Sequence, residues 1–373
     1  MKSIVIIINS LGFGGAERVV VNFLNSSAEK YNCNLILLYS EVNYDLNPKI
    51  NIINLNENPN QNNISKFIRI PLVAFKLSKI IRKNKFKKVI SFLNRSNFIN
   101  IISSFFYNYE VIISERANPS IQYSKGVSGF INKFLIKYLY PYSEKCIVNS
   151  KGNKFELEKN FSLKNVELLY NIFDLNKIYQ IKPDNNKRKK FRFITIGRLD
   201  AGKNQKLIID AIKDIDAELI IIGNGYLLNS LSNYVIKNQI NHKVKFKGQT
   251  SQIFKFLKNS DCFVFSSISE GFPNVIVEAM ACGLPVISSD CKYGPREIIN
   301  PNSNYKQIVN KKVEISDYGI LYPVNNLSCL QEAMKIIIDS NKIRQKLKNN
   351  SKKRALFFDK KNVLKKYYKK FTS

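Results

Sequence analysis

The sequence has very little histidine, and its cysteines do not cluster. His242 is the only histidine among 373 residues, so a histidine-based catalytic triad is not expected and a histidine-rich metal site is excluded. Because His242 flanks a strand-like run, we interpret it as a surface residue. The six cysteines are scattered without CxxC or Cys/His spacing, which favours reduced thiols in a cytosolic protein over zinc ligands or a disulfide framework.

Long apolar runs are also missing, and acidic residues are scarce. No run approaches the roughly 20 residues of a membrane span, and the first residues lack the apolar core and cleavage site of a secretory signal. The chain has 59 basic and 28 acidic residues, for a formal net charge of +31. This excess indicates a polyanionic partner, either nucleic acid or an anionic membrane. A general bias towards Lys, Asn and Ile is an alternative explanation.

What the sequence does contain is an alternation of short apolar runs with helical patterns, in two series. The first series of expected strands is Ser3–Ile8, 34–39, 50–55, 88–93, 111–115, 146–150 and 166–169. The second series is Phe191–Ile196, Ala217–Ile222, 243–246, 262–266 and 285–288. Alternation of this kind predicts an α/β protein with two doubly wound, mostly parallel sheets, which bind ligands at the carboxyl ends of their strands.

A polar, charged segment separates the two series and sets the expected domain boundaries. Residues 181–190 are interpreted as a linker because they combine charge with helix-breaking residues. Residues 1–180 then form the first domain and residues 191–345 the second. Residues 346–373 are expected to form C-terminal helices.

The stretch 269–288 places two carboxylates around the start of a helix between two buried strands. Glu270 precedes the helix, and Glu278 lies about one turn beyond Asn274 on the same face. The free N–H groups at such a helix start attract phosphate. Both carboxylates can therefore meet one ligand, unless they are ordinary solvated charges of a strand-helix-strand unit.

The string EGFPNVIVEAMACGLPVI within this stretch resembles the E-x7-E signature of the retaining nucleotide-sugar glycosyltransferases of family 4. The resemblance implies the GT-B fold, in which two Rossmann-like domains face each other across a cleft. The first domain would bind the acceptor and the second the nucleotide sugar, and in relatives the C-terminal helices cross back to the first domain. The string GRLxxxKN at 197–204 resembles the donor-diphosphate motif of the same family. Arg198 and Lys203 would then flank the leaving diphosphate, unless Asp200 or Asp214 neutralises them at the surface.

The resemblance also implies roles for individual residues. Glu270, Arg198 and Lys203 would act in catalysis, with Glu270 polarising and positioning rather than established as a nucleophile, and Glu278 would bind the ribose hydroxyls. The implied donor-binding residues are Gly14, Gly15, Gly197, Arg198, Lys203, Gly223, Gly248, Glu270, Gly271, Phe272, Pro273, Asn274, Val275 and Glu278.

The implied acceptor is a glycan linked to undecaprenyl diphosphate, of the kind used for O-antigen, capsule or glycoprotein assembly. Ser114, Glu115 and Arg116 resemble the acceptor-side loop of such enzymes. Arg116 could meet the acceptor diphosphate or form a structural pair with Glu115 or Glu17. The segment GPREII at 294–299 resembles subfamilies that transfer N-acetylgalactosamine or galactose, which makes a UDP-sugar the expected donor.

Two basic helical patterns, 67–88 and 131–142, have two open interpretations. They are either amphipathic helices with solvated lysines or a surface that docks on an anionic inner leaflet. The second interpretation places the protein on the cytoplasmic face of the inner membrane as a peripheral protein, beside its lipid-linked acceptor.

No metal or other cofactor is expected, although residues 214–216 read Asp-Ile-Asp, a DxD string. Arg198 and Lys203 would already neutralise the phosphates. Two other functions compete with the glycosyltransferase. A nicotinamide-dependent dehydrogenase is suggested by the glycine turn at 12–15, but Glu17 stands where GxGxxG has its third glycine. A nucleic-acid-binding protein is suggested by the net charge alone, and no nucleic-acid partner is expected.

Overall fold

A computed structural model describes residues 2–12, 14–184 and 190–372, and these divide into two compact units. The first unit comprises Met1–Phe173 and Val363–Ser373, and the second comprises Asp174–Asn362. The expected linker, 181–190, falls inside the second unit, and its residues 185–189 lie outside the described part of the chain. The chain therefore leaves the first unit after Phe173 and returns to it with its last residues.

The first unit is built on a seven-stranded parallel sheet with the order β3-β2-β1-β4-β5-β6-β7. Its strands are β1 (Ser3–Ile8), β2 (Asn32–Leu37), β3 (Asn51–Asn54), β4 (Lys88–Phe92), β5 (Glu110–Glu115), β6 (Lys145–Val148) and β7 (Val166–Leu168). Its helices are α1 (Gly15–Ser27), α2 (Asn63–Ile68), α3 (Ile70–Lys83), α4 (Asn94–Phe106), α5 (Pro119–Gln122), α6 (Gly126–Leu139), η1 (Tyr140–Tyr142) and α7 (Lys151–Asn160).

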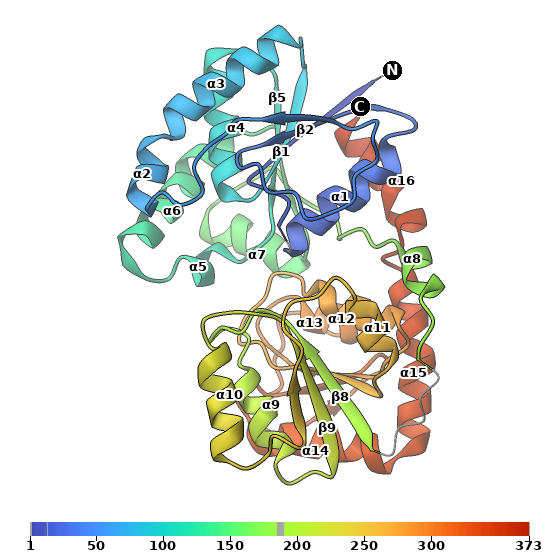
Figure 1. Ribbon diagram of the computed structural model, residues 1–373. Coiled ribbons are helices and arrows are strands. Elements are labelled where there is room, and N and C mark those ends of the chain that lie inside the picture. Colours follow the sequence, from blue (N-terminus) through green and yellow to red (C-terminus); the bar gives the residue numbers. More distant parts are fainter. Residues whose placement is uncertain (1, 13, 185–189, 373) are drawn as a thin grey trace. The chain divides into compact units, whose positions relative to one another are not determined.

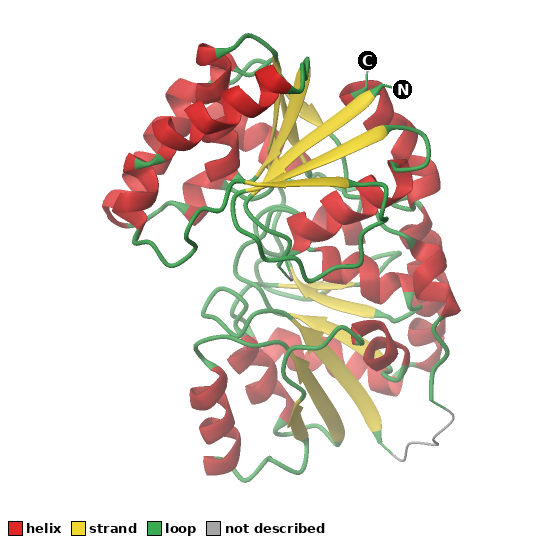
Figure 2. Ribbon diagram, turned by 45° about the horizontal axis from the view of Figure 1, so that its top comes forward, coloured by secondary structure: helices red, strands yellow, loops and turns green. Residues whose placement is uncertain are grey.

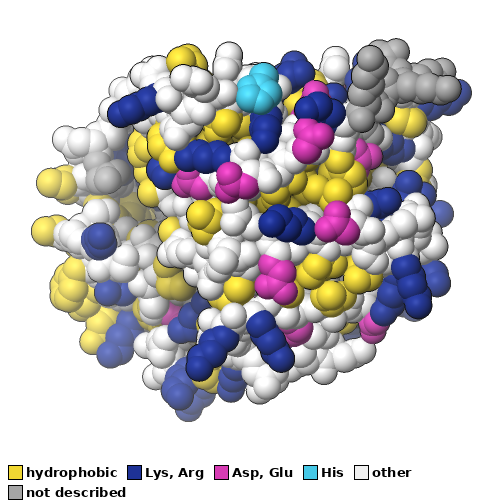
Figure 3. All heavy atoms as spheres, turned by 90° about the horizontal axis from the view of Figure 1, so that it is seen from below, with side chains coloured by type: hydrophobic (Ala, Val, Ile, Leu, Met, Phe, Trp, Pro, Cys, Tyr) yellow, Lys and Arg dark blue, Asp and Glu magenta, His cyan; other side chains and the backbone are white. Residues whose placement is uncertain are grey.

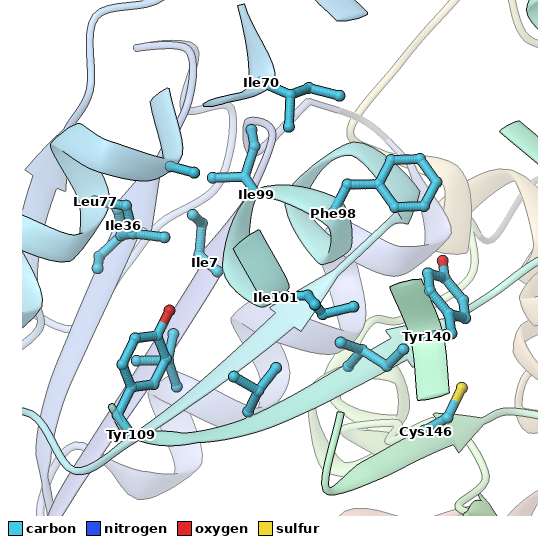
Figure 4. Packing of buried hydrophobic residues seen from close by; sticks show 14 of the residues in the cluster. Ile7, Ile36, Ile70, Leu77, Phe98, Ile99, Ile101, Tyr109, Tyr140 and Cys146 are labelled. Atoms are coloured by element: carbon cyan, nitrogen blue, oxygen red, sulfur yellow. The ribbon is translucent and has the colours of Figure 1, made fainter. Parts of the chain in front are cut away.

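Helices cover both faces of this sheet, as Figures 1 and 2 show. Along β1, Val5 and Ile7 point into a core with α3, α4 and α6, while Ile4 and Ile6 point into a core with α1. Figure 4 shows the first of these cores, where side chains from the helices interleave with those of the strands. A strand that is apolar on both faces is typical of a parallel sheet between two helix layers.

The last helix, α16 (Lys360–Phe371), completes the second core of the first unit. The rings of Tyr367 and Phe371 pack on Phe23 of α1 at centroid distances of 5.3 and 5.4 Å. The Tyr367 hydroxyl donates a hydrogen bond to the carbonyl of Tyr170 at 3.0 Å. Aromatic contacts therefore fix the end of the chain to the unit that contains its beginning.

The second unit has a seven-stranded sheet with the order β10-β9-β8-β11-β12-β14-β13. Its strands are β8 (Phe191–Ile196), β9 (Ala217–Ile222), β10 (Val244–Phe246), β11 (Cys262–Phe265), β12 (Val286–Ser289), β13 (Glu314–Ile315) and β14 (Ile320–Tyr322). Its helices are α8 (Leu175–Gln180), α9 (Gln205–Ile212), α10 (Leu228–Lys237), α11 (Ile253–Lys258), α12 (Asn274–Ala281), α13 (Pro295–Ile299), α14 (Leu327–Asp339) and α15 (Asn341–Leu356).

The expected α/β architecture is confirmed in both units, and every expected strand overlaps an observed one. The sequence reasoning missed β13 and β14, a short antiparallel pair at one edge of the second sheet. It also extended the basic helical pattern 67–88 too far, because α3 ends at Lys83 and Lys88 begins β4. The other basic pattern, expected from residue 131, belongs to a helix that begins at Gly126.

The basic excess is spread over the protein rather than confined to one element. On the face drawn in Figure 3, lysine and arginine side chains are interspersed with acidic and uncharged ones. Among the described residues, no helix combines the length and apolarity needed to cross a membrane.

Candidate active site

Three loops meet at the carboxyl edge of the second sheet, and each carries a glycine that the sequence analysis selected. The N–H of Gly197, after β8, donates to the carbonyl of Ile222 at 3.0 Å, and the N–H of Gly223, after β9, donates to the carbonyl of Gly248, after β10, at 2.9 Å. Gly223 has a φ of +140°, and a Cβ at this position would lie 1.9 Å from the Gly197 carbonyl oxygen. Only glycine lets these backbones approach so closely.

Lys203 and Glu270, expected in catalysis, lie in direct contact. The Lys203 Nζ forms an ion pair with Glu270 Oε1, and both side chains are mostly buried, with 24% and 13% of their surface exposed. The Ser266 hydroxyl, just after β11, donates to the Lys203 carbonyl at 2.8 Å and so ties the two loops together. The ammonium also lies 5.9 Å from the centre of the Phe265 ring. One cation and one carboxylate are thereby fixed at the edge where ligands bind.

Arg198 is held much more loosely than Lys203. Its side chain is 82% exposed, and its Nε lies 3.3 Å from Asp200 Oδ2. Asp200, one of the two carboxylates expected as possible neutralising partners of Arg198 and Lys203, therefore contacts Arg198. An exposed ion pair contributes about 0–1 kcal/mol, so Arg198 can exchange Asp200 for a ligand anion at little cost. Gln205 fixes the backbone of the loop by donating to the Arg198 carbonyl at 2.8 Å.

The helix that follows Glu270 begins as expected, but its side chains point largely into the protein. Asn274 begins α12, with Pro273 at the cap position. Glu278 is only 1% exposed and Phe272 is 6% exposed, and the Phe272 ring packs on Phe358 at 5.4 Å. Phe272 can therefore offer a ligand its backbone rather than its ring. Val275, whose side chain is half-buried, lies at the same helix start.

The sequence reasoning did not assign Gly294 to the site, although this residue shapes the loop beside Glu270. Gly294 has a φ of +85°, and a Cβ there would lie 2.9 Å from the Gly271 carbonyl oxygen and 2.7 Å from Pro273 Cδ. The signal was present, since a Gly-Pro pair directly before a helix marks a turn.

Arg296 of the GPREII segment is a buried structural residue. It is 3% exposed, and its Nε lies 3.2 and 3.1 Å from the Asp290 carboxylate oxygens. Its two terminal nitrogens donate to Glu314 at 3.1 and 3.0 Å. Burial raises the pKa of Asp290 above its ordinary value. This network holds the Gly294 loop in place.

In the first unit, the expected acceptor-side residues Ser114, Glu115 and Arg116 are all buried at the end of β5. Glu115 accepts hydrogen bonds from the Tyr140 hydroxyl at 2.7 Å and from the Arg116 backbone N–H at 2.9 Å. Burial raises the pKa of the Glu115 carboxyl. The Arg116 guanidinium donates to Asn171 Oδ1 at 2.6 Å. The Ser114 hydroxyl donates to the Ile147 carbonyl at 3.3 Å. These contacts place all three side chains in the framework beneath the loop.

Gly14 and Gly15 lie at the start of α1, with Gly14 at the cap position. A Cβ on Gly14 would lie 2.1 Å from Glu17 Oε2, so the Glu17 carboxylate occupies the space over the helix start. The Tyr44 hydroxyl donates to the Gly14 carbonyl at 3.3 Å. Glycine at position 14 therefore makes room for a carboxylate in the first turn.

The DxD string lies away from the glycine loops. Asp216 directly precedes β9, at the amino edge of the second sheet, and pairs with Lys190 at 2.6 Å. Asp214 accepts a hydrogen bond from Gln331 at 3.1 Å. Across the described ranges, no group of three or more His, Cys, Asp or Glu side chains could hold a metal ion.

Comparison with known proteins identifies close relatives of the chain. Residues 177–354 match the family described as glycosyl transferases group 1. A Campylobacter jejuni protein named N-acetylgalactosamine-N,N'-diacetylbacillosaminyl-diphospho-undecaprenol 4-alpha-N-acetylgalactosaminyltransferase is 34% identical over 367 residues, which cover 96% of each chain. A second protein of that organism, a GalNAc-alpha-(1->4)-GalNAc-alpha-(1->3)-diNAcBac-PP-undecaprenol alpha-1,4-N-acetyl-D-galactosaminyltransferase, is 26% identical over 96% of this chain and 95% of its own.

Solved structures share the fold at low sequence identity. Sucrose-phosphate synthase from Thermosynechococcus elongatus superposes with a TM-score of 0.84 at 16% identity, covering 99% of this chain and 98% of its own. HepE of Anabaena, solved in complex with UDP and glucose, superposes with a TM-score of 0.78 at 18% identity, covering 98% and 99%. The expected GT-B fold is thereby confirmed.

Proposed function

The chain belongs to the glycosyl transferases group 1 family and is a glycosyltransferase, and from this premise we propose that it transfers a sugar from a UDP-sugar to a glycan carried on undecaprenyl diphosphate. The names of the two Campylobacter relatives support the acceptor class and make N-acetylgalactosamine the first donor sugar to test. Family membership removes the dehydrogenase alternative. We propose no nucleic-acid partner.

The observation that carries this proposal is the contact between Lys203 and Glu270 beside the glycine loops of the second unit. In the proposed reaction, Lys203 and the loosely held Arg198 neutralise the departing diphosphate, which accelerates the step because their interaction strengthens as the phosphate charge grows. The positive end of the α12 dipole, at Asn274, contributes to the same anion site.

We assign Glu270 a polarising and positioning role, in a transfer that retains the anomeric configuration. Its Oε1 is paired with the Lys203 ammonium, which stabilises the carboxylate and makes it a weaker nucleophile. Glu270 then orients Lys203 and the donor sugar. Proton NMR of the product distinguishes retention from inversion, since the new linkage is α for an α-linked donor only when configuration is retained.

We propose that the reaction requires no metal ion, because Arg198 and Lys203 supply the positive charge that a cation would otherwise provide. The position of the DxD string at the amino edge of its sheet, away from the glycine loops, is consistent with this proposal. Activity that survives exhaustive EDTA treatment would support it. Loss of activity that is restored by Mg²⁺ or Mn²⁺ would refute it.

We also propose that the protein docks on the anionic cytoplasmic leaflet through one face of the first unit, the apolar–basic face. Helices α2, α3 and α6 lie on the same side of this unit (Figure 1). Their exposed apolar residues are Ile64, Ile68, Leu72, Phe75, Val127, Phe130, Phe134 and Tyr138. The sequences of these three helices contain lysine and arginine but no Asp or Glu. Apolar insertion combined with attraction to anionic lipid is the usual basis of peripheral binding.

The membrane proposal has a matched control within the chain. Phe130→Asp places a charge on the apolar–basic face, whereas Ile236→Asp does so at a residue of similar exposure in α10 of the second unit, 65% against 69%. We expect Phe130→Asp to abolish co-flotation with phosphatidylglycerol vesicles and Ile236→Asp to leave it intact. Equal binding of both variants would refute the assignment of this face.

The enzymatic proposal is tested by UDP release from a panel of UDP-sugars, with and without a sugar-diphosphate-lipid acceptor. Release from one donor that depends on acceptor and is lost in Glu270→Ala and Lys203→Ala would establish donor class and site together. Turnover of a GDP- or ADP-sugar in place of every UDP-sugar would refute the donor assignment.

A further inference from the structure

The first unit contains a pocket of about 300 Å³ that the sequence analysis did not anticipate. It is enclosed by residues of α2, α3, α4, α5 and α6. Its polar lining consists of Lys66, Asn94, Arg95, Gln122, Ser128 and Asn132. Its apolar lining includes Phe67, Ile70 and Phe98, of which the last two are seen in Figure 4. A concave site with apolar walls and a few convergent polar groups is typical of a ligand pocket.

The charged side chains that line the pocket are all positive, which favours an anionic ligand. Lys66 and Arg95 are its charged residues, and among the described side chains no carboxylate lines it. The Arg95 side chain is 11% exposed, and one of its terminal nitrogens donates to the Tyr39 hydroxyl. Within the described residues, Arg95 Nε and Nη2 have no hydrogen-bond partner. A buried guanidinium with unused donors is costly unless a ligand or water completes its hydrogen bonds.

The nearest carboxylate does not cancel this charge. Glu57 lies 3.7 Å from Arg95 Nη2, but Arg69 holds it with two hydrogen bonds at 3.1 and 2.9 Å, and Lys76 lies 3.8 Å away. The bond from Arg69 lowers the pKa of Glu57. One carboxylate therefore serves three cations, and the cluster beside the pocket keeps a net positive charge.

The amino-terminal ends of three helices add to the positive electrostatic potential of the pocket. Ile70, Asn94 and Ser128 lie in the first turns of α3, α4 and α6, helices of 14, 13 and 14 residues. The residue before α4, Leu93, has a φ of +73° and makes no side-chain cap bond. The positive ends of three helices therefore converge on the pocket that contains Lys66 and Arg95.

We infer that this pocket binds the diphosphate group of the lipid-linked acceptor, an assignment that rests on the proposed function. Lys66, Arg95 and the start of α4 would contact the phosphate oxygens. Phe67, Ile70 and Phe98 would contact the first isoprene units. Helices α2, α3 and α6, which line the pocket, also form the apolar–basic face, so a lipid chain can leave the pocket directly into the bilayer.

The absence of tryptophan from the chain allows a direct binding assay. Phe67→Trp introduces a single fluorophore into the pocket, and its emission is titrated with farnesyl diphosphate, farnesol and inorganic diphosphate. Lys66→Ala and Arg95→Gln are made in this background. Lys83→Ala, at the far end of α3, is the control that removes the same charge outside the pocket.

We expect farnesyl diphosphate to bind at least about tenfold more weakly to Lys66→Ala and Arg95→Gln, the size of one lost charge-assisted hydrogen bond. The Lys83→Ala control should stay within about twofold. Unchanged affinity in both pocket variants would overturn the assignment, as would equal binding of farnesol. If inorganic diphosphate binds as tightly as farnesyl diphosphate, the pocket recognises free diphosphate, and its assignment to a lipid-linked diphosphate is refuted. Because Lys66 is only half-buried, its variant tests the pocket even if Arg95→Gln does not fold.

Transfer assays separate this inference from the proposed function. If the pocket variants raise the acceptor KM but not the donor KM, both stand. If the protein binds farnesyl diphosphate through Lys66 and Arg95 but transfers no sugar to a lipid diphosphate, the pocket assignment stands and the proposed function fails. If transfer proceeds with an acceptor KM that neither variant changes, the function stands and the pocket assignment fails.

Discussion

The three glycines at the carboxyl edge of the second sheet allow a graded test of the donor site. Each is replaced by alanine, and the structure assigns a different penalty to each. At Gly197 the new Cβ would lie 3.7 Å from Lys203, an ordinary contact. At Gly248 it would meet no atom within 4 Å, but φ is +65°. At Gly223 both the conformation and the space are unfavourable.

The expected losses follow from these geometries. Gly197→Ala should change the free energy of unfolding by less than about 0.5 kcal/mol. Gly248→Ala should cost about 1–2 kcal/mol, because a Cβ is strained in the left-handed region. Gly223→Ala combines about 1–3 kcal/mol of backbone strain with about 1–3 kcal/mol for displacing the Gly197 carbonyl oxygen, which would lie 1.9 Å from the new Cβ.

Thermal unfolding of the whole protein measures this order, since about 2–4 °C is lost per kcal/mol in a domain of this size. Gly223→Ala should therefore melt about 10 °C below wild type and should also raise the UDP-sugar KM, because relieving the clash moves the Gly223 loop away from the Gly197 loop. A Gly223→Ala protein that melts with wild type would refute the reasoning. So would a larger loss in Gly197→Ala than in Gly248→Ala.

Further changes test the ion pairs. Lys203→Ala should lower kcat by about 100-fold through loss of charge-assisted contacts to the leaving group; an unchanged UDP release rate would contradict this. Arg296→Met should destabilise the second unit by about 3–5 kcal/mol by leaving the Asp290 carboxylate buried and unpaired, and urea unfolding measures the loss; a smaller loss than about 1 kcal/mol would contradict it. The bond from Arg69 lowers the folded pKa of Glu57, so its stabilisation is complete above the ordinary carboxyl pKa and disappears as the pH falls through the lowered value. The stability difference between wild type and Glu57→Gln should accordingly shrink between about pH 6 and about pH 3; a constant difference would show that Glu57 does not titrate in this way.

The proximity of the residues proposed for the donor side could be predicted from the sequence because the segments that carry them are local. Glu270 and Asn274 belong to one strand-loop-helix unit, and Gly197 and Lys203 belong to another. Parallel topology then brings the loops of successive strands to the same edge without any further information. What the sequence did not indicate is the contact between Lys203 and Glu270, since a pairing across 67 positions depends on which strands become neighbours.

Two arginines in similar sequence contexts differ in burial, and this difference could not be predicted from the sequence. Arg198 and Arg296 both follow glycine motifs, but one side chain is 82% exposed and the other residue is 3% exposed. The difference arises because Asp290 and Glu314 surround Arg296, and Glu314 comes from the antiparallel strand β13 that the sequence reasoning missed. The role of an arginine therefore depended on an edge strand of two residues, which carries almost no periodic signal.

The pocket of the first unit was hidden for a related reason. Lys66, Arg95 and Asn132 come from three helices spread over more than sixty positions, and none of them belongs to a recognisable motif. The sequence did show helices α3 and α6 as basic and amphipathic, because that property repeats along each helix. An amphipathic basic surface can thus be recognised from one helix at a time, whereas a pocket exists only where the starts of several helices meet. The proposed membrane face and the proposed pocket share helices α2, α3 and α6. In the two proposals together, the outer sides of these helices contact the bilayer and their inner sides bind the charged group that the bilayer presents.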